Sequence, residues 1–434
     1  MISTIYRIPI AKEKYSIIIL IGSALITLIT AVDRKFDMSN NIENVLILQG
    51  GGSLGAFGCG VFKALANGNI KIDIIAGTSI GGLNASIIAG AKGEDHPEKA
   101  LEQYWLELGE SSTNLNSPFI EWLTRYPTPT LTPLPSLTPT TEHSAMTHIS
   151  EVKSVMSFYR SAIYGDSKIF VPRWSPEFAF TDPQYFTPNK WTYLYDHSPL
   201  VKTAEKHIDY NKLQPNGKPK SRLIITAVNV LTAEPLIFDS TKEQITSKHI
   251  LAATAYPSYY FRWVEVEKGV YAWDGSLLSN TPLREVIDAA PVKDKQIFLV
   301  ENYPKKSDML PDNLLEVQHR ARDIMFSDKT ISSIQLSKSI TYYLRLIDDL
   351  YRMLEDHFSS EKKKDIEKFE NIRARYKKVS QEHGAEIKRV HYITRSEPFP
   401  SLYENADFSV DTVKASIKDG ELKTNQILKE IKMS

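Results

Sequence analysis

Two short apolar stretches, each followed by glycines and then by a helical pattern, constrain the fold of this chain more than any other feature. Residues 45–48 and 72–76 have the composition of strands buried on both faces. Between them, residues 56–66 carry apolar side chains at helical spacing, and Asn67-Gly68 ends the pattern. The order strand, glycine loop, helix, repeated twice over residues 45–93, predicts a βαβ unit and therefore a parallel sheet in an α/β fold.

The second glycine loop contains a GxSxG pentapeptide, Gly77-Thr78-Ser79-Ile80-Gly81. A strand before it and a helix after it are the setting that a nucleophile elbow requires. Ser79 would lie at a helix N-terminus, where peptide dipoles favour a developing alkoxide, and Gly77 and Gly81 would permit the tight turn. The pattern predicts Ser79 as a catalytic nucleophile. The alternative is an ordinary glycine turn with a serine N-cap.

The first glycine loop, residues 50–55, also lies between a strand and a helix. It fits the dinucleotide fingerprint GxGxxG, which needs an acidic residue near the end of the following strand. Here Asp73 stands at the start of that strand, and the strand runs into the serine loop instead. Backbone amides that face the same crevice as Ser79 suit an oxyanion hole better, although a dinucleotide site and a structural turn stay open as alternatives. The predicted oxyanion residues are Gly50, Gly51, Gly52, Ser53 and Gly55.

A carboxylate far along the chain is the leading candidate for the base. Asp274 lies between Trp273 and Gly275, a position that is often only a turn, but beside a serine nucleophile it could take the hydroxyl proton, with Gly275 supporting its loop. None of the ten histidines lies at a glycine-flanked strand end. His249 and His391 are the least unsuitable, and a triad of Ser79, Asp274 and His391 in the α/β-hydrolase order stays open.

Together these motifs resemble one family. Gln49-Gly50-Gly51-Gly52-Ser53-Leu54-Gly55, the GxSxG segment at 77–81 and Asp274-Gly275, in that order and spacing, are similar to the patatin-like phospholipases, especially bacterial members, over roughly residues 46–323. The resemblance implies a three-layer α/β acyl hydrolase with a mainly parallel central sheet, a serine–aspartate dyad, and lipid acyl hydrolysis without a metal or other cofactor. Two positions depart from the family: many members have arginine at Leu54 and a small residue at Ser276.

The expected organisation has three parts. Residues 44–305 form the catalytic domain, interrupted by a proline- and threonine-rich insertion at 126–141 that predicts an extended surface loop. Residues 306–434 form a mainly helical extension, which also includes a returning strand. The further elements expected are strands at 222–228, 297–301 and 386–394, helices at 314–354 and 361–380, and a terminal helix that Ser409 caps and that pauses at Gly420.

The N-terminal extension, residues 1–37, contains a stretch without charge at 15–32. Its length of about 18 residues is the lower limit for a membrane-spanning helix. No small-residue cleavage site follows it, which favours an uncleaved anchor and a membrane-associated protein. The alternative is a start at Met38, which would give a cytoplasmic enzyme.

Composition narrows the function further. The chain contains 52 basic residues (lysine and arginine) and 52 acidic residues (aspartate and glutamate). It therefore has no excess of positive charge that would attract it to nucleic acid. Cys59 is the only cysteine, which excludes an intrachain disulfide and a multi-cysteine metal site. The predicted function is hydrolysis of a phospholipid or another acyl-ester lipid at a membrane surface, of the phospholipase A, lysophospholipase or esterase type, through an acyl-enzyme. The alternatives are a catalytically silent, membrane-associated binding protein, suggested by Leu54 and Ser276, and a nucleotide-binding oxidoreductase.

Overall fold

The structure is a computed structural model. It describes residues 42–93, 96–113, 161–289, 293–307, 310–327, 330–358, 370–379, 386–397 and 404–433. The chain divides into the units Met1–Ile42 and Glu43–Ser434, and the elements described belong to the second. The predicted anchor at 15–32 and the insertion at 126–141 lie outside the described residues. No helix in the described part of the chain combines the length and apolar character that a membrane crossing needs.

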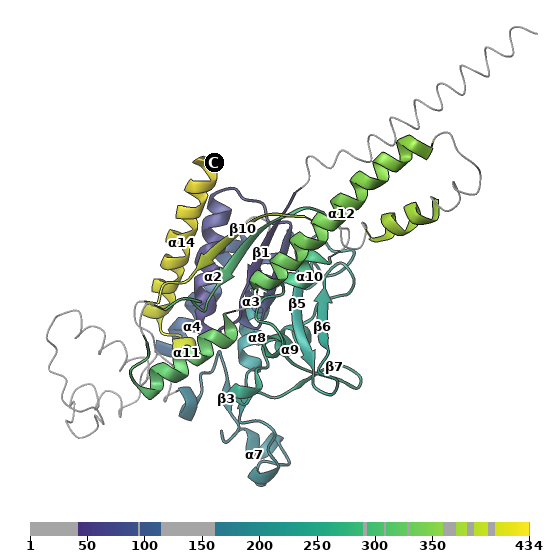
Figure 1. The fold of residues 1–434 in the computed structure, drawn as a ribbon. Helices are drawn as coiled ribbons and strands as arrows, with labels where there is room; N and C mark the ends of the chain where they lie inside the picture. Colours follow the sequence, from purple (N-terminus) through teal and green to yellow (C-terminus); the bar gives the residue numbers. More distant parts are fainter. Residues whose placement is uncertain are drawn as a thin grey trace, which may run out of the picture. The chain divides into compact units, whose positions relative to one another are not determined.

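The centre of the second unit is an eight-stranded sheet (Figure 1). Five neighbouring strands are parallel, and three antiparallel strands extend the sheet beyond β5. The parallel strands, in spatial order, are β10 (Ile387–Thr394), β9 (Lys295–Glu301), β1 (Glu43–Leu48), β2 (Ile74–Thr78) and β5 (Arg222–Asn229). The antiparallel strands are β6 (Pro235–Asp239) and β8 (Val270–Asp274), both paired with β5, and β7 (Val264–Glu267), paired with β8. A separate two-stranded sheet joins β3 (Val171–Pro172) and β4 (Tyr195–Asp196).

Successive side chains of the buried strands enter two different cores, because neighbouring residues of a strand point to opposite faces of a sheet. In β1, Leu46 and Leu48 join the larger core, whereas Val45 and Ile47 join the smaller one. Strands β2, β5 and β9 divide their side chains in the same way. The sheet is therefore the middle layer of three, and its continuous apolar runs follow from burial on both faces.

Helices cover the two faces unequally. The larger core contains residues of α2 (Gly55–Asn67), α3 (Ile80–Ala89), α4 (Pro97–Thr113), α8 (Ser198–Glu205), α9 (Ser247–Ala253) and α14 (Val410–Met433). The smaller core contains residues of α10 (Leu283–Ile287) and α12 (Thr330–Phe358). Outside both cores are α11 (Leu314–Phe326) and the short α7 (Phe178–Thr181). Figure 1 shows α14 beside α2, far from it in sequence. The three-layer fold with a mainly parallel sheet is confirmed.

The expected strands and the βαβ unit are confirmed, and the strand expected at 386–394 is β10, at the edge of the central sheet. The helical character expected at 314–354 is confirmed, and it is divided between two helices, since α11 ends at Phe326 and α12 begins at Thr330. One expectation about a helix was wrong. Helix α14 continues through Gly420, where a Cβ atom would collide with the carbonyl oxygen of Phe57. This glycine permits a close helix crossing and does not end the helix. Of the helix expected at 361–380, residues 370–379 are described and are helical.

Candidate active site

Ser79 occupies a sharp turn between β2 and α3. Its φ of 56° and ψ of −132° are unusual for a residue with a side chain, and such strain persists only where the surroundings enforce it. Here the turn is tight enough that a Cβ atom on Gly77 would collide with the backbone of Gly81. A Cβ atom on Gly81 would meet the carbonyl oxygen of Leu48 at the end of β1. The strand, turn and helix have the geometry of a nucleophile elbow.

Asp274 reaches the same edge of the sheet from an antiparallel strand. It is the last residue of β8 and pairs with Ala227 of β5, whose neighbour Thr226 pairs with Thr78. The Oγ1 atoms of Thr78 and Thr226 lie 3.0 Å apart. Gly275 fits against this pair, because a Cβ atom there would be 2.6 Å from Thr226 Oγ1. The pairing of these strands thus places Asp274 close to Ser79, although 195 residues separate them in the sequence.

The Asp274 carboxylate is fully buried and only partly bonded. Its Oδ1 accepts a hydrogen bond of 2.8 Å from the Ser276 amide, whereas its Oδ2 has no full hydrogen bond from any described residue. Burial raises the pKa of Asp274 to about 6, and the Ser79 hydroxyl and Ser276 oppose that rise. Ser79 is therefore close enough to act on the carboxylate without making a hydrogen bond of normal geometry.

The glycine loop lies directly against the nucleophile. A Cβ atom on Gly50 would be 2.7 Å from the Cβ of Ser79. The Gly50 amide donates to Asn280 Oδ1 at 3.0 Å, and the Gly55 amide donates to the carbonyls of Gly52 and Ser53. These two amides, which the sequence placed in the oxyanion set, are thus already paired within the chain.

The remaining amides of that set are free donors. Residues Gly52–Leu54 form a short 3₁₀ helix, η1, in which the Leu54 amide donates to the Gly51 carbonyl. The first amides of a helix have no acceptor within it. Within the described part of the chain, the amides of Gly51, Gly52 and Ser53 have no acceptor.

Three polar side chains that the sequence analysis did not assign to the site fix the start of the loop. Gln49 Nε2 donates to Thr281 Oγ1, and the Asn302 amide donates to Gln49 Oε1, both at 3.0 Å. Asn302 Nδ2 donates to the carbonyls of Gln49 and Gly50, and Asn280 Oδ1 accepts from the Gly50 amide. The signal that could have found Asn280 and Asn302 is their position just after Asp274 and after the predicted strand at 297–301.

A cavity of about 500 Å³ opens at Ser79. Gly52 and Ile80 flank the serine in its wall, and Asp274, which is not part of the wall, lies buried behind it. Most of the wall is apolar or aromatic and comes from segments that the sequence analysis left without a role. These lining residues include Ile169, Phe170, Tyr195, Leu200, Tyr256, Tyr259, Tyr260, Phe261, Met325, Phe326 and Phe408.

The histidines considered for a triad lie elsewhere. His249 bonds to the Thr246 amide at the start of α9 and stacks on Phe238. His391 belongs to β10, five strand positions from β8, which is about 24 Å at roughly 4.8 Å per strand. The histidine in the cavity wall is His197, whose Nε2 is 2.9 Å from the Leu251 carbonyl oxygen and whose pKa burial lowers. None of these three rings bonds to Asp274 or Ser79 in the described structure.

A model of the family described as patatin-like phospholipase matches residues 46–287, more than half of the chain. The chain belongs to the patatin-like phospholipase family. The segment that matches includes the glycine loop, the elbow and Asp274, whereas β9, β10, α11, α12 and α14 lie beyond it.

The solved structures that match this chain include the following, all at low identity. VipD from Legionella pneumophila is 13% identical, with a TM-score of 0.34 and coverage of 90% of this chain and 67% of that one. ExoU of Pseudomonas aeruginosa, solved in complex with SpcU, is 14% identical, with a TM-score of 0.23 and coverage of 64% and 47%. A further ExoU structure is 15% identical, with a TM-score of 0.20 and coverage of 65% and 51%. The chain thus spans about half of the ExoU chains. A search of curated proteins gives no match.

Proposed function

We propose that this patatin-like chain is a serine hydrolase that cleaves acyl esters of lipids through a Ser79–Asp274 dyad. The observation that carries the proposal is the strained Ser79 in the wall of an apolar cavity, beside a buried, incompletely bonded carboxylate. A serine needs an adjacent base to become a nucleophile, and Asp274 is the base in reach.

In the proposed reaction, Ser79 Oγ attacks the ester carbonyl carbon while its proton passes to Asp274 Oδ2. The carbonyl oxygen becomes an oxyanion, which the amides of Gly51, Gly52 and Ser53 stabilise. The C–O bond to the alcohol breaks, and Asp274 returns the proton to the departing oxygen. Water then attacks the carbonyl carbon of the acyl-enzyme while Asp274 takes one of its protons, the bond from that carbon to Ser79 Oγ breaks, and Asp274 returns the proton to Oγ as the fatty acid leaves. The amide of Ile80, the residue after the nucleophile and the first of α3, is a further donor beside the oxyanion.

The electrostatics of Asp274 suit this role. An aspartate at its ordinary pKa is a weak base for a hydroxyl, whereas burial raises the pKa of Asp274 to about 6. A group with that pKa is mostly ionised at neutral pH and still accepts a proton readily, which is the compromise that general-base catalysis favours.

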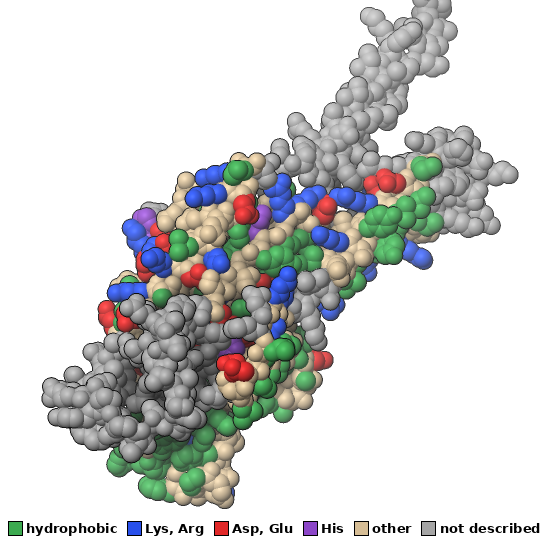
Figure 2. Space-filling view, turned by 60° about the vertical axis from the view of Figure 1, so that its left-hand side comes forward, with side chains coloured by type: hydrophobic (Ala, Val, Ile, Leu, Met, Phe, Trp, Pro, Cys, Tyr) green, Lys and Arg blue, Asp and Glu red, His purple; other side chains and the backbone are tan. Residues whose placement is uncertain are grey.

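The cavity supports a lipid as the substrate. Its volume lies in the range of small-molecule sites, and its aromatic wall would accept an acyl chain. Tyr260 lines it and is 59% exposed, so the cavity reaches the surface there. Phe180 in α7 and Phe186 after it are largely exposed, and hydrophobic side chains gather around α7 at the bottom of Figure 2. This surface favours contact with a lipid surface, and a membrane-associated protein is the proposed setting.

Labelling with a fluorophosphonate tests the proposal. The reagent should modify the wild-type protein at Ser79, identified by peptide mapping, and Ser79→Ala should abolish labelling and nearly all hydrolysis of a short-chain chromogenic ester. A protein that resists labelling and cleaves neither that ester nor phospholipid vesicles would instead be the catalytically silent binding protein.

A further inference from the structure

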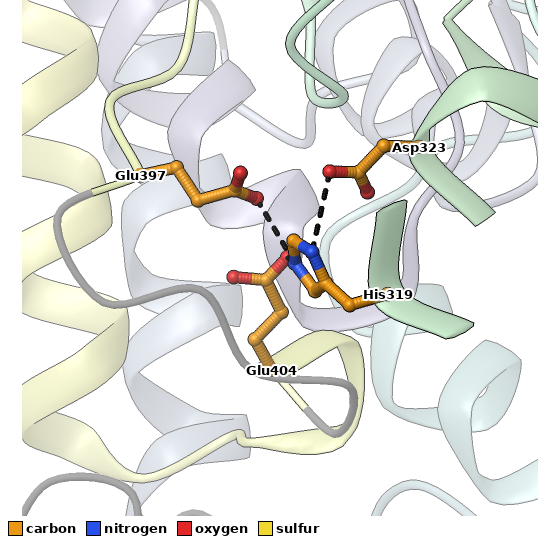
Figure 3. A group of neighbouring side chains, drawn as sticks. All are labelled: His319, Asp323, Glu397 and Glu404. Carbon is orange, nitrogen blue, oxygen red and sulfur yellow. Dashed lines mark hydrogen bonds and ion pairs between the residues drawn. The ribbon is translucent and has the colours of Figure 1, made fainter. Parts of the chain in front are cut away.

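A cluster of charged side chains lies beside the proposed oxyanion loop, outside the segment that matches the family. His319 and Asp323 come from α11, Glu397 follows β10, and Glu404 begins the short 3₁₀ helix η5 (Glu404–Ala406) (Figure 3). Figure 3 shows the His319 ring pointing between the three carboxylates. All four side chains are largely buried, so their charges must be compensated locally.

Two arginines supply that compensation. Glu404 accepts from Arg322 at 2.7 Å and from Arg395 at 3.0 Å, and His319 Nε2 lies 3.4 Å from it. Arg395 also binds Glu397 at 2.6 Å, and Arg322 binds Asp323 at 2.9 Å. With His319 protonated, three cations face three anions, and Glu404 is the carboxylate that contacts all three cations.

The arrangement favours an ion-pair network over a metal centre, although four potential ligand atoms lie within 4.8 Å of one another. Burial alone would lower the pKa of His319, but its contacts with Glu397 and Glu404 raise it to about 9. The ring is then a cation at neutral pH, whereas a metal binds neutral imidazole. The arginines already hold the carboxylates that a metal would need.

The backbone of η5, at Glu404 and Asn405, packs against the oxyanion loop. Ser53 Oγ donates a 2.7 Å hydrogen bond to the carbonyl oxygen of Glu404. The carbonyl oxygen of Asn405 lies so close to Gly52 that a Cβ atom there would collide with it. The side chain of Asn405 is tied to the Tyr259 hydroxyl in the cavity wall. The position of η5 therefore fixes Gly52 and Ser53, two of the three residues whose amides are free.

Arg322 connects the network to the same loop from the other side. Its guanidinium lies over the Tyr303 ring, 5.4 Å from the centroid. The Tyr303 hydroxyl would be 3.2 Å from a Cβ atom on Gly51, so it packs directly on the loop. Arg322 also lines the cavity. The ion pairs, η5 and Tyr303 thus surround the loop.

We propose that Glu404 is a positioning residue for the oxyanion hole, which holds η5 against Gly52 and Ser53 through its ion pairs with Arg322, Arg395 and His319. The inference rests on the proposed function. The proposal also explains why Leu54 can replace the arginine that many family members carry in this loop. In this chain the support comes from His319 and Arg322 of α11 and from Arg395, which follows β10.

The test compares Glu404→Gln with a matched variant, Asp239→Asn. Both remove the charge of a buried carboxylate that is bound to arginine, but Asp239 pairs with Arg222 at the opposite end of β5, remote from Ser79. We expect Glu404→Gln to reduce kcat and the rate of fluorophosphonate labelling at least tenfold while KM changes less than twofold. Asp239→Asn should lose stability and keep kcat within twofold.

A second variant covers the case in which Glu404→Gln does not fold. Ser53→Ala removes only the hydroxyl that bonds to the Glu404 carbonyl and leaves the Ser53 amide in place, and it should reduce kcat severalfold at unchanged KM. Near wild-type kcat in either folded variant, or an equal loss in Asp239→Asn, would overturn the positioning role. A wild-type protein that resists fluorophosphonate would instead refute the proposed function itself.

Discussion

Replacing Asp274 with asparagine should abolish activity and yet make the protein more stable at neutral pH. The pKa of Asp274 is about 6 in the folded protein, against 3.8 for an ordinary aspartate. Because the folded state binds the proton more tightly, ionisation of Asp274 costs stability. That cost is absent below about pH 4, grows between pH 4 and 6, and reaches about 3 kcal/mol above pH 6, at about 1.4 kcal/mol for each pKa unit.

The asparagine would remove this cost without losing the existing hydrogen bond. Its Oδ1 can still accept from the Ser276 amide, and its Nδ2 would face the Ser79 hydroxyl. An imperfect bond at Nδ2 would subtract part of the gain, since an unpaired buried donor costs about 1–3 kcal/mol. We therefore expect Asp274→Asn to raise the free energy of unfolding by up to about 3 kcal/mol at pH 7.5, and by less than about 1 kcal/mol at pH 4. Hydrolysis should fall by several orders of magnitude.

Urea unfolding followed by tryptophan fluorescence at the two pH values measures the effect, with Asp239→Asn as the control of opposite sign. Burial would raise the pKa of Asp239, but hydrogen bonds from Arg222 and Thr241 and the Arg222 charge hold it below its ordinary value. That carboxylate stabilises the fold when ionised, so Asp239→Asn should destabilise at pH 7.5 and less so in acid. An Asp274→Asn protein that is less stable than wild type at pH 7.5, or one that retains activity, would refute the reasoning.

Other predictions follow from the same site. Gly50→Ala should reduce kcat at least a hundredfold, because its Cβ would lie 2.7 Å from the Cβ of Ser79, and circular dichroism should show that the fold remains. His249→Gln and His391→Gln should each keep ester hydrolysis within about threefold of wild type, and the reaction should proceed in chelator; a large loss in either variant would favour a histidine-based mechanism. A chain that begins at Met38 should fold and cleave a monomeric ester, since the compact unit starts at Glu43, and aggregation or inactivity of that chain would move the boundary.

Local patterns in the sequence predicted the parts of the fold that form locally. Three features lie close together in the sequence: the apolar run before Ser79, the glycines around it and the helical spacing after it. The elbow and the βαβ unit could therefore be predicted from the residues alone. The pairing of β8 with β5, which brings Asp274 to Ser79, joins segments far apart in the chain, so the residues alone made Asp274 a candidate base and the family resemblance supported it.

The residues that surround the site could not be predicted from the sequence for the same reason. The cavity wall comes from aromatic segments without periodicity, and an irregular loop gives no rule for which side chain faces inward. No pattern in the sequence singles out Arg322, Arg395 and Glu404, and only their burial in the folded chain shows them to be a network. Gly420 shows the converse error: a glycine in a helical pattern predicts a stop unless the neighbouring helix is known.

The contact between η5 and the glycine loop can form only late in synthesis of the chain. Gly52 leaves the ribosome roughly 350 residues before Glu404, which at about 5–20 residues per second is a delay of about 20–70 s. During that interval the nascent chain already contains Ser79 and, later, Asp274, but not the segment that rests on Gly52 and Ser53. If the proposed hydrolase depends on this contact, it would gain full activity only after η5 has been made, and membranes near the ribosome would not be hydrolysed at the full rate until then.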